Sequence, residues 1–142
     1  MIDPDVAFNH GVAHRLSLAL ATLVTGATLT SESDVPFEPF TAEFETGTKV
    51  TASTFKAALG FDPGRQAVLS PASVFFANAV AATDDPGTQQ VFAVLERVMR
   101  RSLTGLTQAF VRGDGIVEVP FFLFGRLAGG PLVGLRSIAI ET

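Results

Sequence analysis

The side chains in this sequence that could do chemistry are few, and most of them are carboxylates next to turns. Glu32 lies between Ser31 and Ser33 in the polar stretch 31–36, SESDVP. Serine and aspartate side chains bond to nearby backbone groups in turns, so such a bend would hold Glu32 in a fixed position. The simpler alternative is that Glu32 is a solvated acid on a surface turn.

A second pair of negative groups follows the last apolar stretch, residues 132–140, where only Glu141 and Thr142 remain. If this stretch is a strand, the sheet fixes the backbone two residues before Thr142, and the α-carboxylate of Thr142 stays near the sheet. Most C-termini fray, so an ordinary terminus without a role is the alternative. Anchored oxygen anions of this kind suit a Mg²⁺ or Ca²⁺ ion in another protein's active site, or the basic residues around it. They are too few to predict a metal site or a cofactor of this chain's own.

Other catalytic signals are weak. The sequence contains no GxSxG motif, no phosphate-binding glycine loop and no HExxH motif. His10 and His14 are four residues apart on an expected helix and could share a metal ion, but without a third ligand a solvated helix face explains them better. Because no pair of nucleophile and base is visible, we expect the protein not to be an enzyme.

Composition excludes several classes of function. The 142 residues correspond to one domain, and 10 Lys and Arg against 14 Asp and Glu give a net charge of −4. This balance argues against direct binding of nucleic acid through a basic surface. The absence of cysteine excludes disulfides, thiol catalysis and cysteine zinc sites. All aromatic residues are phenylalanines, so a protein interface would lack the Tyr and Trp anchors that such interfaces usually contain.

The sequence predicts neither a membrane span nor a secretion signal. No apolar run approaches the roughly 18 residues that a transmembrane helix needs. Residues 16–24 resemble the apolar core of a signal peptide, but Asp3 and Asp5 stand where a signal peptide would be positively charged.

Hydrophobic periodicity predicts three helices, at residues 4–24, 71–82 and 88–102. Asp3 and Pro4 suit the start of the first helix, Gly26 suits its end, and Ser70 is expected to cap the second. Residues 49–58 are ambiguous between a strand, an irregular segment and a short helix.

Strands are predicted from residue 37 to about 45, and at residues 106–112, 116–126 and 132–140. Pro39 places the first strand at an edge of the sheet. The last two strands are apolar on both faces, so helices should cover both sides of the sheet. We therefore predict a single-domain α+β fold, an α-β-α sandwich with a mainly antiparallel central sheet.

Two segments carry a family resemblance. Residues 31–40, SESDVPFEPF, and residues 130–142, GPLVGLRSIAIET, resemble the inhibitors of sugar-non-specific nucleases, the nuclease A inhibitor-like (NuiA-like) family. In that family a helix precedes an SES-acid-x-PFE-x-F segment, and the last strand closes in Glu-Thr. The resemblance covers the chain from about residue 14, so residues 1–13 are expected to be an N-terminal extension of the one domain.

The resemblance implies an architecture similar to pathogenesis-related-1 proteins and tight inhibition of a ββα-metal nuclease that cleaves DNA and RNA. The family's elbow glutamate and terminal threonine approach the nuclease's catalytic metal, and Glu32 and Thr142 stand at the matching positions. We therefore expect Ser31, Glu32, Ser33, Glu141 and Thr142 to form the binding site. The resemblance also implies a cytoplasmic location, where the inhibitor protects the producing cell before the nuclease is exported.

One departure from the family leaves a second hypothesis open. The family inhibitor uses a tryptophan in the loop between its middle helices, whereas the loop 82–87 here carries Asp84 and Asp85. These acids are candidate contacts for the partner, although solvation is the simpler explanation for them. Without the tryptophan, the chain could instead be an interaction module of the same fold with an unknown partner and no inhibitory role.

Overall fold

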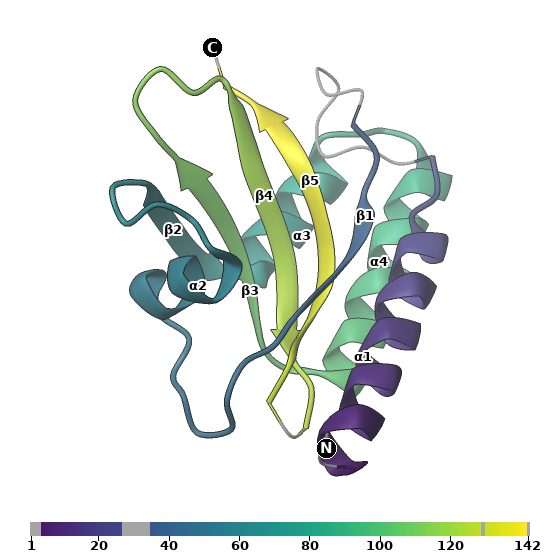
Figure 1. Cartoon of the computed structure of the whole chain (residues 1–142). Helices are drawn as coiled ribbons and strands as arrows, with labels where there is room; N and C mark the ends of the chain where they lie inside the picture. Colours follow the sequence, from purple (N-terminus) through teal and green to yellow (C-terminus); the bar gives the residue numbers. More distant parts are fainter. Residues whose placement is uncertain (1–3, 27–34, 129, 142) are drawn as a thin grey trace.

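The structure, a computed structural model, describes the backbone of residues 4–26, 35–128 and 130–141, and side chains from residue 11 onward. The described residues form four helices and five strands (Figure 1). In chain order these are α1 Pro4–Leu23, β1 Glu38–Ala42, α2 Ala52–Leu59, β2 Gln66–Pro71, α3 Ala72–Ala81, α4 Pro86–Ser102, β3 Thr104–Arg112, β4 Glu118–Arg126 and β5 Leu132–Ile140.

The strands form one sheet in the order β1-β5-β4-β3-β2, and every neighbouring pair is antiparallel. The longest pairing joins β4 to β5, from Glu118 opposite Ile140 to Arg126 opposite Leu132. β1 lies at an edge, as its Pro39 predicted, because a residue without a backbone N–H is tolerated there.

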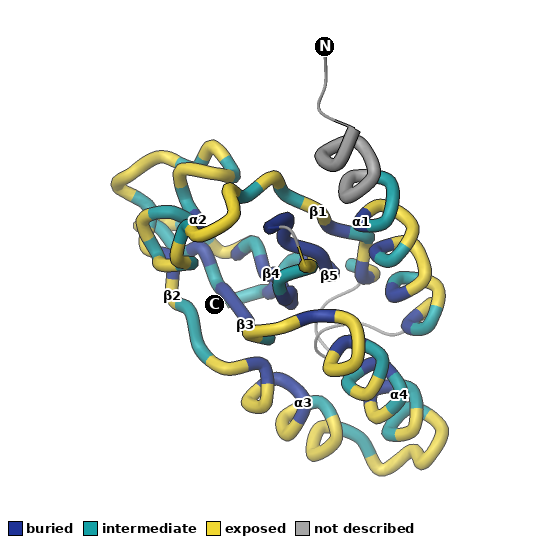
Figure 2. Tube along the Cα trace, turned by 90° about the horizontal axis from the view of Figure 1, so that it is seen from below, coloured by how far each residue is buried: buried dark blue, intermediate teal, exposed yellow. Residues whose placement is uncertain are grey.

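Both faces of the sheet are covered, which confirms the predicted α+β sandwich. Along β4, Phe121 and Leu123 belong to the core shared with α1, α3 and α4, whereas Phe122 and Phe124 belong to the core shared with α2. Seen from below, buried residues of the central strands lie between these two sets of helices (Figure 2). The alternation follows from the period of two in a strand, which sends successive side chains to opposite faces.

The ambiguous segment 49–58 contains a helix. In α2, Phe55 is fully buried and stacks on Phe124 with ring centroids 5.1 Å apart. Thr51 and Thr54 form a capping box at its start, and Gly60 ends it with a φ of 74°. Phe55 is the buried residue of this short helix, and Ala52 and Leu59 pack beside it on the same core.

One strand was missed and one local prediction was wrong. β2 was not predicted, because among its residues only Ala67 is buried and the alternating signal is weak. Ser70 does not cap α3, whose N-cap residue is Pro71 without a side-chain bond. The Ser70 hydroxyl instead accepts a hydrogen bond from Gln108 Nε2 at 2.8 Å, which ties β2 to β3.

Asp85 is the N-cap of α4, which begins at Pro86, two residues earlier than predicted. Its carboxylate accepts hydrogen bonds from the Thr88 backbone N–H at 3.1 Å and from the Thr88 hydroxyl at 2.7 Å. These bonds lower the pKa of Asp85 below its ordinary value of 3.8, and the bond from the Thr88 hydroxyl has the largest effect. The charge also lies at the positive end of the helix dipole.

Close packing of β4 against β5 depends on Gly134. A methyl group at this position would lie 1.9 Å from the carbonyl oxygen of Leu123.

We expect Gly134→Ala to destabilise the fold by more than about 4 kcal/mol or to prevent folding, measured by urea denaturation. Gly11→Ala is the control, because no atom lies within 4 Å there and alanine should stabilise α1 by about 0.5–1 kcal/mol. Equal stabilities of the two variants would contradict this account of the packing.

The cap at Asp85 predicts a pH dependence of stability. Because the folded-state pKa is lower than the unfolded one, the ionised carboxylate stabilises the fold above about pH 4–5, and this contribution is lost as pH falls through the lowered pKa. Asp85→Asn can still cap α4 but does not titrate. The difference in unfolding free energy between wild type and Asp85→Asn should therefore be constant near neutral pH and change only at acid pH. Urea denaturation at a series of pH values measures it, and a difference independent of pH would contradict the assignment.

Candidate functional site

The antiparallel pairing of β1 with β5 brings two distant parts of the sequence together. Glu38 lies opposite Arg136, so the start of β1 is beside the final residues of β5 (Figure 1). We call this region, marked by Val35, Val117 and Glu141, the β5 end of the sheet. It is the end at which the sequence analysis expected the binding residues.

The segment that enters β1 is fixed at this end. The buried Ser137 hydroxyl donates a hydrogen bond to the carbonyl oxygen of Val35 at 3.2 Å. Two residues later Phe37 is buried, with its ring against those of Phe75 and Phe92 at centroid distances of 6.1 and 6.4 Å. The chain is therefore anchored three residues after Glu32.

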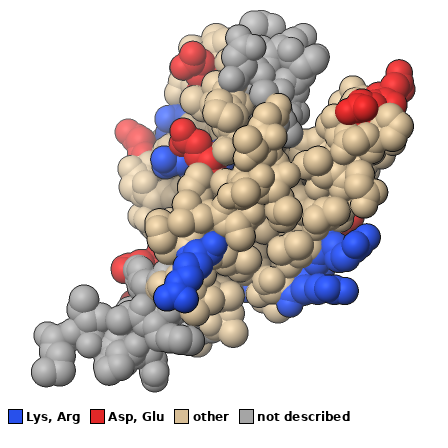
Figure 3. Space-filling view, turned by 90° about the vertical axis from the view of Figure 1, so that its right-hand side faces the viewer, with Lys and Arg blue, Asp and Glu red and all other residues tan. Residues whose placement is uncertain are grey.

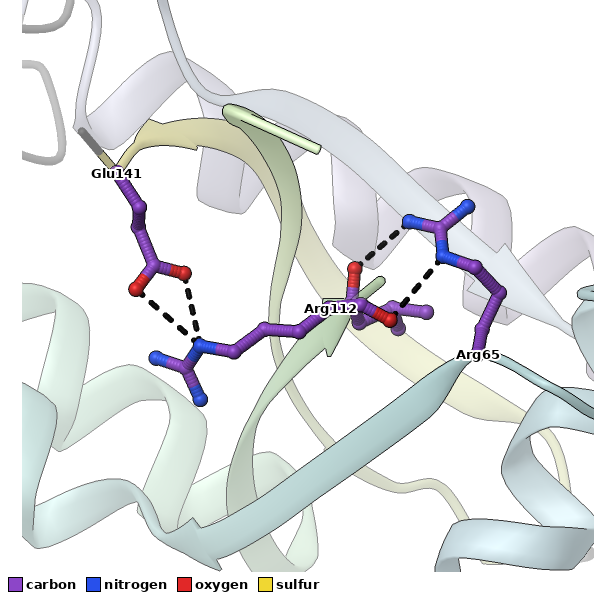
Figure 4. A network of polar contacts seen from close by, with 4 residues as sticks. Arg65, Arg112 and Glu141 are labelled. Carbon is purple, nitrogen blue, oxygen red and sulfur yellow. Dashed lines mark hydrogen bonds and ion pairs between the residues drawn. The ribbon is translucent and has the colours of Figure 1, made fainter. Parts of the chain in front are cut away.

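The C-terminal end of β5 is fixed as well. The Glu141 backbone N–H donates to the carbonyl oxygen of Val117 at 2.9 Å, and the Arg112 Nε donates to both Glu141 carboxylate oxygens, at 2.8 and 3.2 Å. Arg65 in turn donates to the carbonyl oxygens of Val111 and Arg112 (Figure 4). Glu141 is thus held through both its backbone and its side chain.

Four of the predicted binding residues lie outside the described part of the chain, namely Ser31, Glu32, Ser33 and Thr142. The described neighbours Val35 and Ser137 are bonded to each other, and they lie three residues from Glu32 and five from Thr142. This contact joins the segment after residue 34 to β5. The approach of Glu32 to Thr142 stays a prediction.

Asp84 and Asp85 lie in the loop between α3 and α4, and both are exposed. Figure 1 shows this loop toward the end of the molecule at which β5 finishes. Asp85 is engaged in capping α4, while Asp84 has no such intramolecular role among the described contacts. On the side of the molecule seen in Figure 3, acidic and basic side chains are scattered over a mostly uncharged surface. α4 itself starts after Asp85 and carries Arg100 and Arg101 in its last turn.

The metal and enzyme hypotheses gain no support from the described residues. These contain no group of three or more His, Asp or Glu side chains that could hold a metal ion. His14 is exposed on α1. A hollow between the starts of α3 and β3 is lined by Arg100 as its one charged residue, alongside Ser73. Within the described ranges, no helix combines the length and apolar character that a membrane crossing requires.

Sequence reasoning missed the side chains that fix the β5 end. Arg112, Arg65 and Ser137 were given no role, because each acts through a partner that is distant in the sequence. A signal for one pair was present in the predicted strands. β3 and β5 both flank β4 and run in the same direction, so Arg112 and Glu141, of opposite charge, come after equivalent ends.

Comparison with known proteins gives a family for the chain. A family model described as nuclease A inhibitor-like protein matches residues 14–142, from the middle of α1 through the residue after Glu141. No curated protein matches the chain. The family suggests inhibition of a nuclease in general, a nuclease as protein partner, and a non-catalytic role. Since the matched region covers nearly all of the sequence, the chain belongs to the nuclease A inhibitor-like protein family.

Proposed function

We propose that this protein inhibits a sugar-non-specific ββα-metal nuclease by covering its active site with the β5 end of the sheet. The observation that carries the proposal is the bond between Ser137 and Val35, which joins the segment following Glu32 to the last strand. The second support is the family match, which extends through Thr142. A rigid support for both carboxylates lowers the entropy that would otherwise be lost on binding.

The chemistry of the contact follows from the nuclease's own requirements. A site that cleaves phosphodiesters binds phosphate oxygens and a hydrated Mg²⁺ ion. The carboxylates of Glu32 and Thr142 offer the same hard oxygen ligands and the same charge. Ser31 and Ser33, which flank Glu32 in the sequence, belong to the same proposed contact, and the inhibitor itself contributes no catalytic group or cofactor.

Electrostatic attraction would assist this encounter. Glu118 is exposed opposite Ile140, and Asp114 is exposed in the turn before it. Asp84 is exposed in the loop before α4, and the whole chain carries a charge of −4. A nuclease cleft that binds polyanions is positively charged, so long-range attraction would orient the inhibitor toward it. The proposed location is the cytoplasm of the cell that makes and exports the nuclease.

A second candidate function is binding to an unknown protein without inhibition. The absence of tryptophan favours it, because an aromatic anchor at an interface often contributes a few kcal/mol. An assay of the wild-type protein against several ββα-metal nucleases at micromolar concentration separates the two candidates. Inhibition supports the first, and its complete absence supports the second.

The mechanism predicts that both carboxylates are needed. Glu32→Ala, and separately a short polar extension after Thr142, should each raise the inhibition constant by about tenfold or more, because each removes or displaces a ligand of the partner's metal site. Glu45→Ala is the matched control, since Glu45 is exposed in the loop after β1, away from the β5 end. Thermal denaturation checks that all three variants fold. Full inhibition by both test variants would exclude this mechanism.

Asp84 and Asp85 are expected to differ in role, because Asp85 caps α4 and Asp84 does not. Asp84→Asn should slow association with the nuclease by about twofold and weaken its dependence on salt, because a charge at the rim of an interface acts mainly on the association rate. It should leave the thermal midpoint unchanged, since Asp84 does not cap α4. Stopped-flow association rates at two salt concentrations measure the effect. A faster dissociation with unchanged association would instead place Asp84 inside the contact.

A further inference from the structure

Glu141 was expected to contact the partner, but its carboxylate is turned back onto the molecule. Both of its oxygens accept from Arg112 Nε, and its side chain and that of Arg112 are each 39% exposed. The pair spans β4, because Arg112 ends β3 and Glu141 follows β5 (Figure 4). The interaction therefore links the two strands that flank β4 at the point where β5 leaves the sheet.

Arg112 is itself held from two sides. Its guanidinium lies over the ring of Phe110, with Cζ 4.8 Å from the ring centroid. Its backbone carbonyl accepts a hydrogen bond from Arg65 Nε at 3.2 Å, and the carbonyl of Val111 accepts one from Arg65 Nη2 at 2.8 Å. A stacked arginine on a fixed backbone loses less rotamer freedom when it forms an ion pair than a solvated one does.

Other ion pairs in the described part of the chain lack this support. Arg100 pairs with Glu96 within one turn of α4, and Arg136 pairs with Glu38 where both side chains are more than half exposed. Exposed pairs of this kind contribute little to stability. The Arg112–Glu141 pair differs in two ways. The Arg112 guanidinium is stacked on Phe110, and the backbone N–H of Glu141 is also hydrogen-bonded, to the carbonyl oxygen of Val117.

From this geometry we infer that Arg112 is a positioning residue: with Glu141 as its internal counter-ion, it sets the course of the C-terminal end of β5 as it leaves the sheet. Glu141 then acts within the inhibitor and does not contact the nuclease. The effect on inhibition rests on the proposed function, whereas the effect on the β5 end does not. Positioning of the β5 end and direct contact with the nuclease predict different results for variants of Arg112 and Glu141.

The first test needs no partner. Hydrogen exchange of the Glu141 backbone N–H in the free protein reports the bond to Val117. Arg112→Met and Glu141→Gln should each speed this exchange by about threefold to tenfold, with the thermal midpoint unchanged, because an isolated half-exposed pair adds little global stability. Arg100→Met, which breaks an Arg–Glu pair at the far end of α4, is the matched control. Unchanged exchange in Arg112→Met would overturn the inference.

The second test is a double-mutant cycle on the dissociation rate of the complex with an inhibited nuclease. Positioning predicts that each single variant dissociates about threefold to tenfold faster and that Arg112→Met/Glu141→Gln is no worse than either. The exchanged pair Arg112→Glu/Glu141→Arg should recover part of the loss. A loss in Glu141→Gln alone, with Arg112→Met like wild type, would mean direct contact with the nuclease and would overturn the inference. If wild type inhibits no nuclease, the proposed function fails and the exchange measurement still decides the role of Arg112.

Discussion

The structure depends on the burial of β4 and β5 on both faces. Phe121 and Leu123 require a helical layer on one side of the sheet, and Phe122 and Phe124 require one on the other. A strand with two apolar faces is stable only at the centre of a sheet that is covered on both sides. This requirement places β1 and β2 at the edges and divides the helices between two layers. It also means that the last strand is part of the core almost to its final residue.

Anchoring the last strand in the core has a consequence for binding. A C-terminal segment usually frays, and a frayed segment loses conformational entropy when a partner orders it. Here the backbone of Glu141 is still bonded, and the entry to β1 is joined to the same strand through Ser137. Weak polar contacts are sufficient to fix these two chain ends, because the apolar core has already placed the strands from which they extend. These contacts contribute little to global stability, and they direct only the few residues next to them.

The parts of the fold that the sequence predicted well have strong local signals. The bounds of β5, Leu132–Ile140, agree with the prediction because an apolar run follows a glycine-proline turn. The edge position of β1 follows from Pro39 alone. β2 escaped prediction because only Ala67 among its residues is buried, and the neighbouring Val68, on the opposite face, is apolar although it is exposed. Of the predicted binding residues, the described ones are Asp84, Asp85 and Glu141. Asp85 contacts Thr88, and Glu141 contacts Arg112. The second contact spans 29 positions in the sequence, so the order of the strands indicates it and the spacing of the residues does not.

On the proposed function, the placement of the phenylalanines leaves the interface to depend mainly on charge. Of the phenylalanines whose side chains the structure describes, none is exposed, so the aromatic surface of this protein is committed to its two cores. The largest apolar side chain exposed beside Glu141 is Val117, whose own backbone carbonyl holds the Glu141 N–H. An interface formed at this end would combine a small apolar contact with several carboxylates. Carboxylates recognise a metal ion and its basic surroundings, which are common to a class of nucleases, whereas aromatic anchors fit pockets specific to one partner. On the proposed function, affinity for a given nuclease would therefore depend more on the chemistry of its catalytic centre than on the shape of the surface around it.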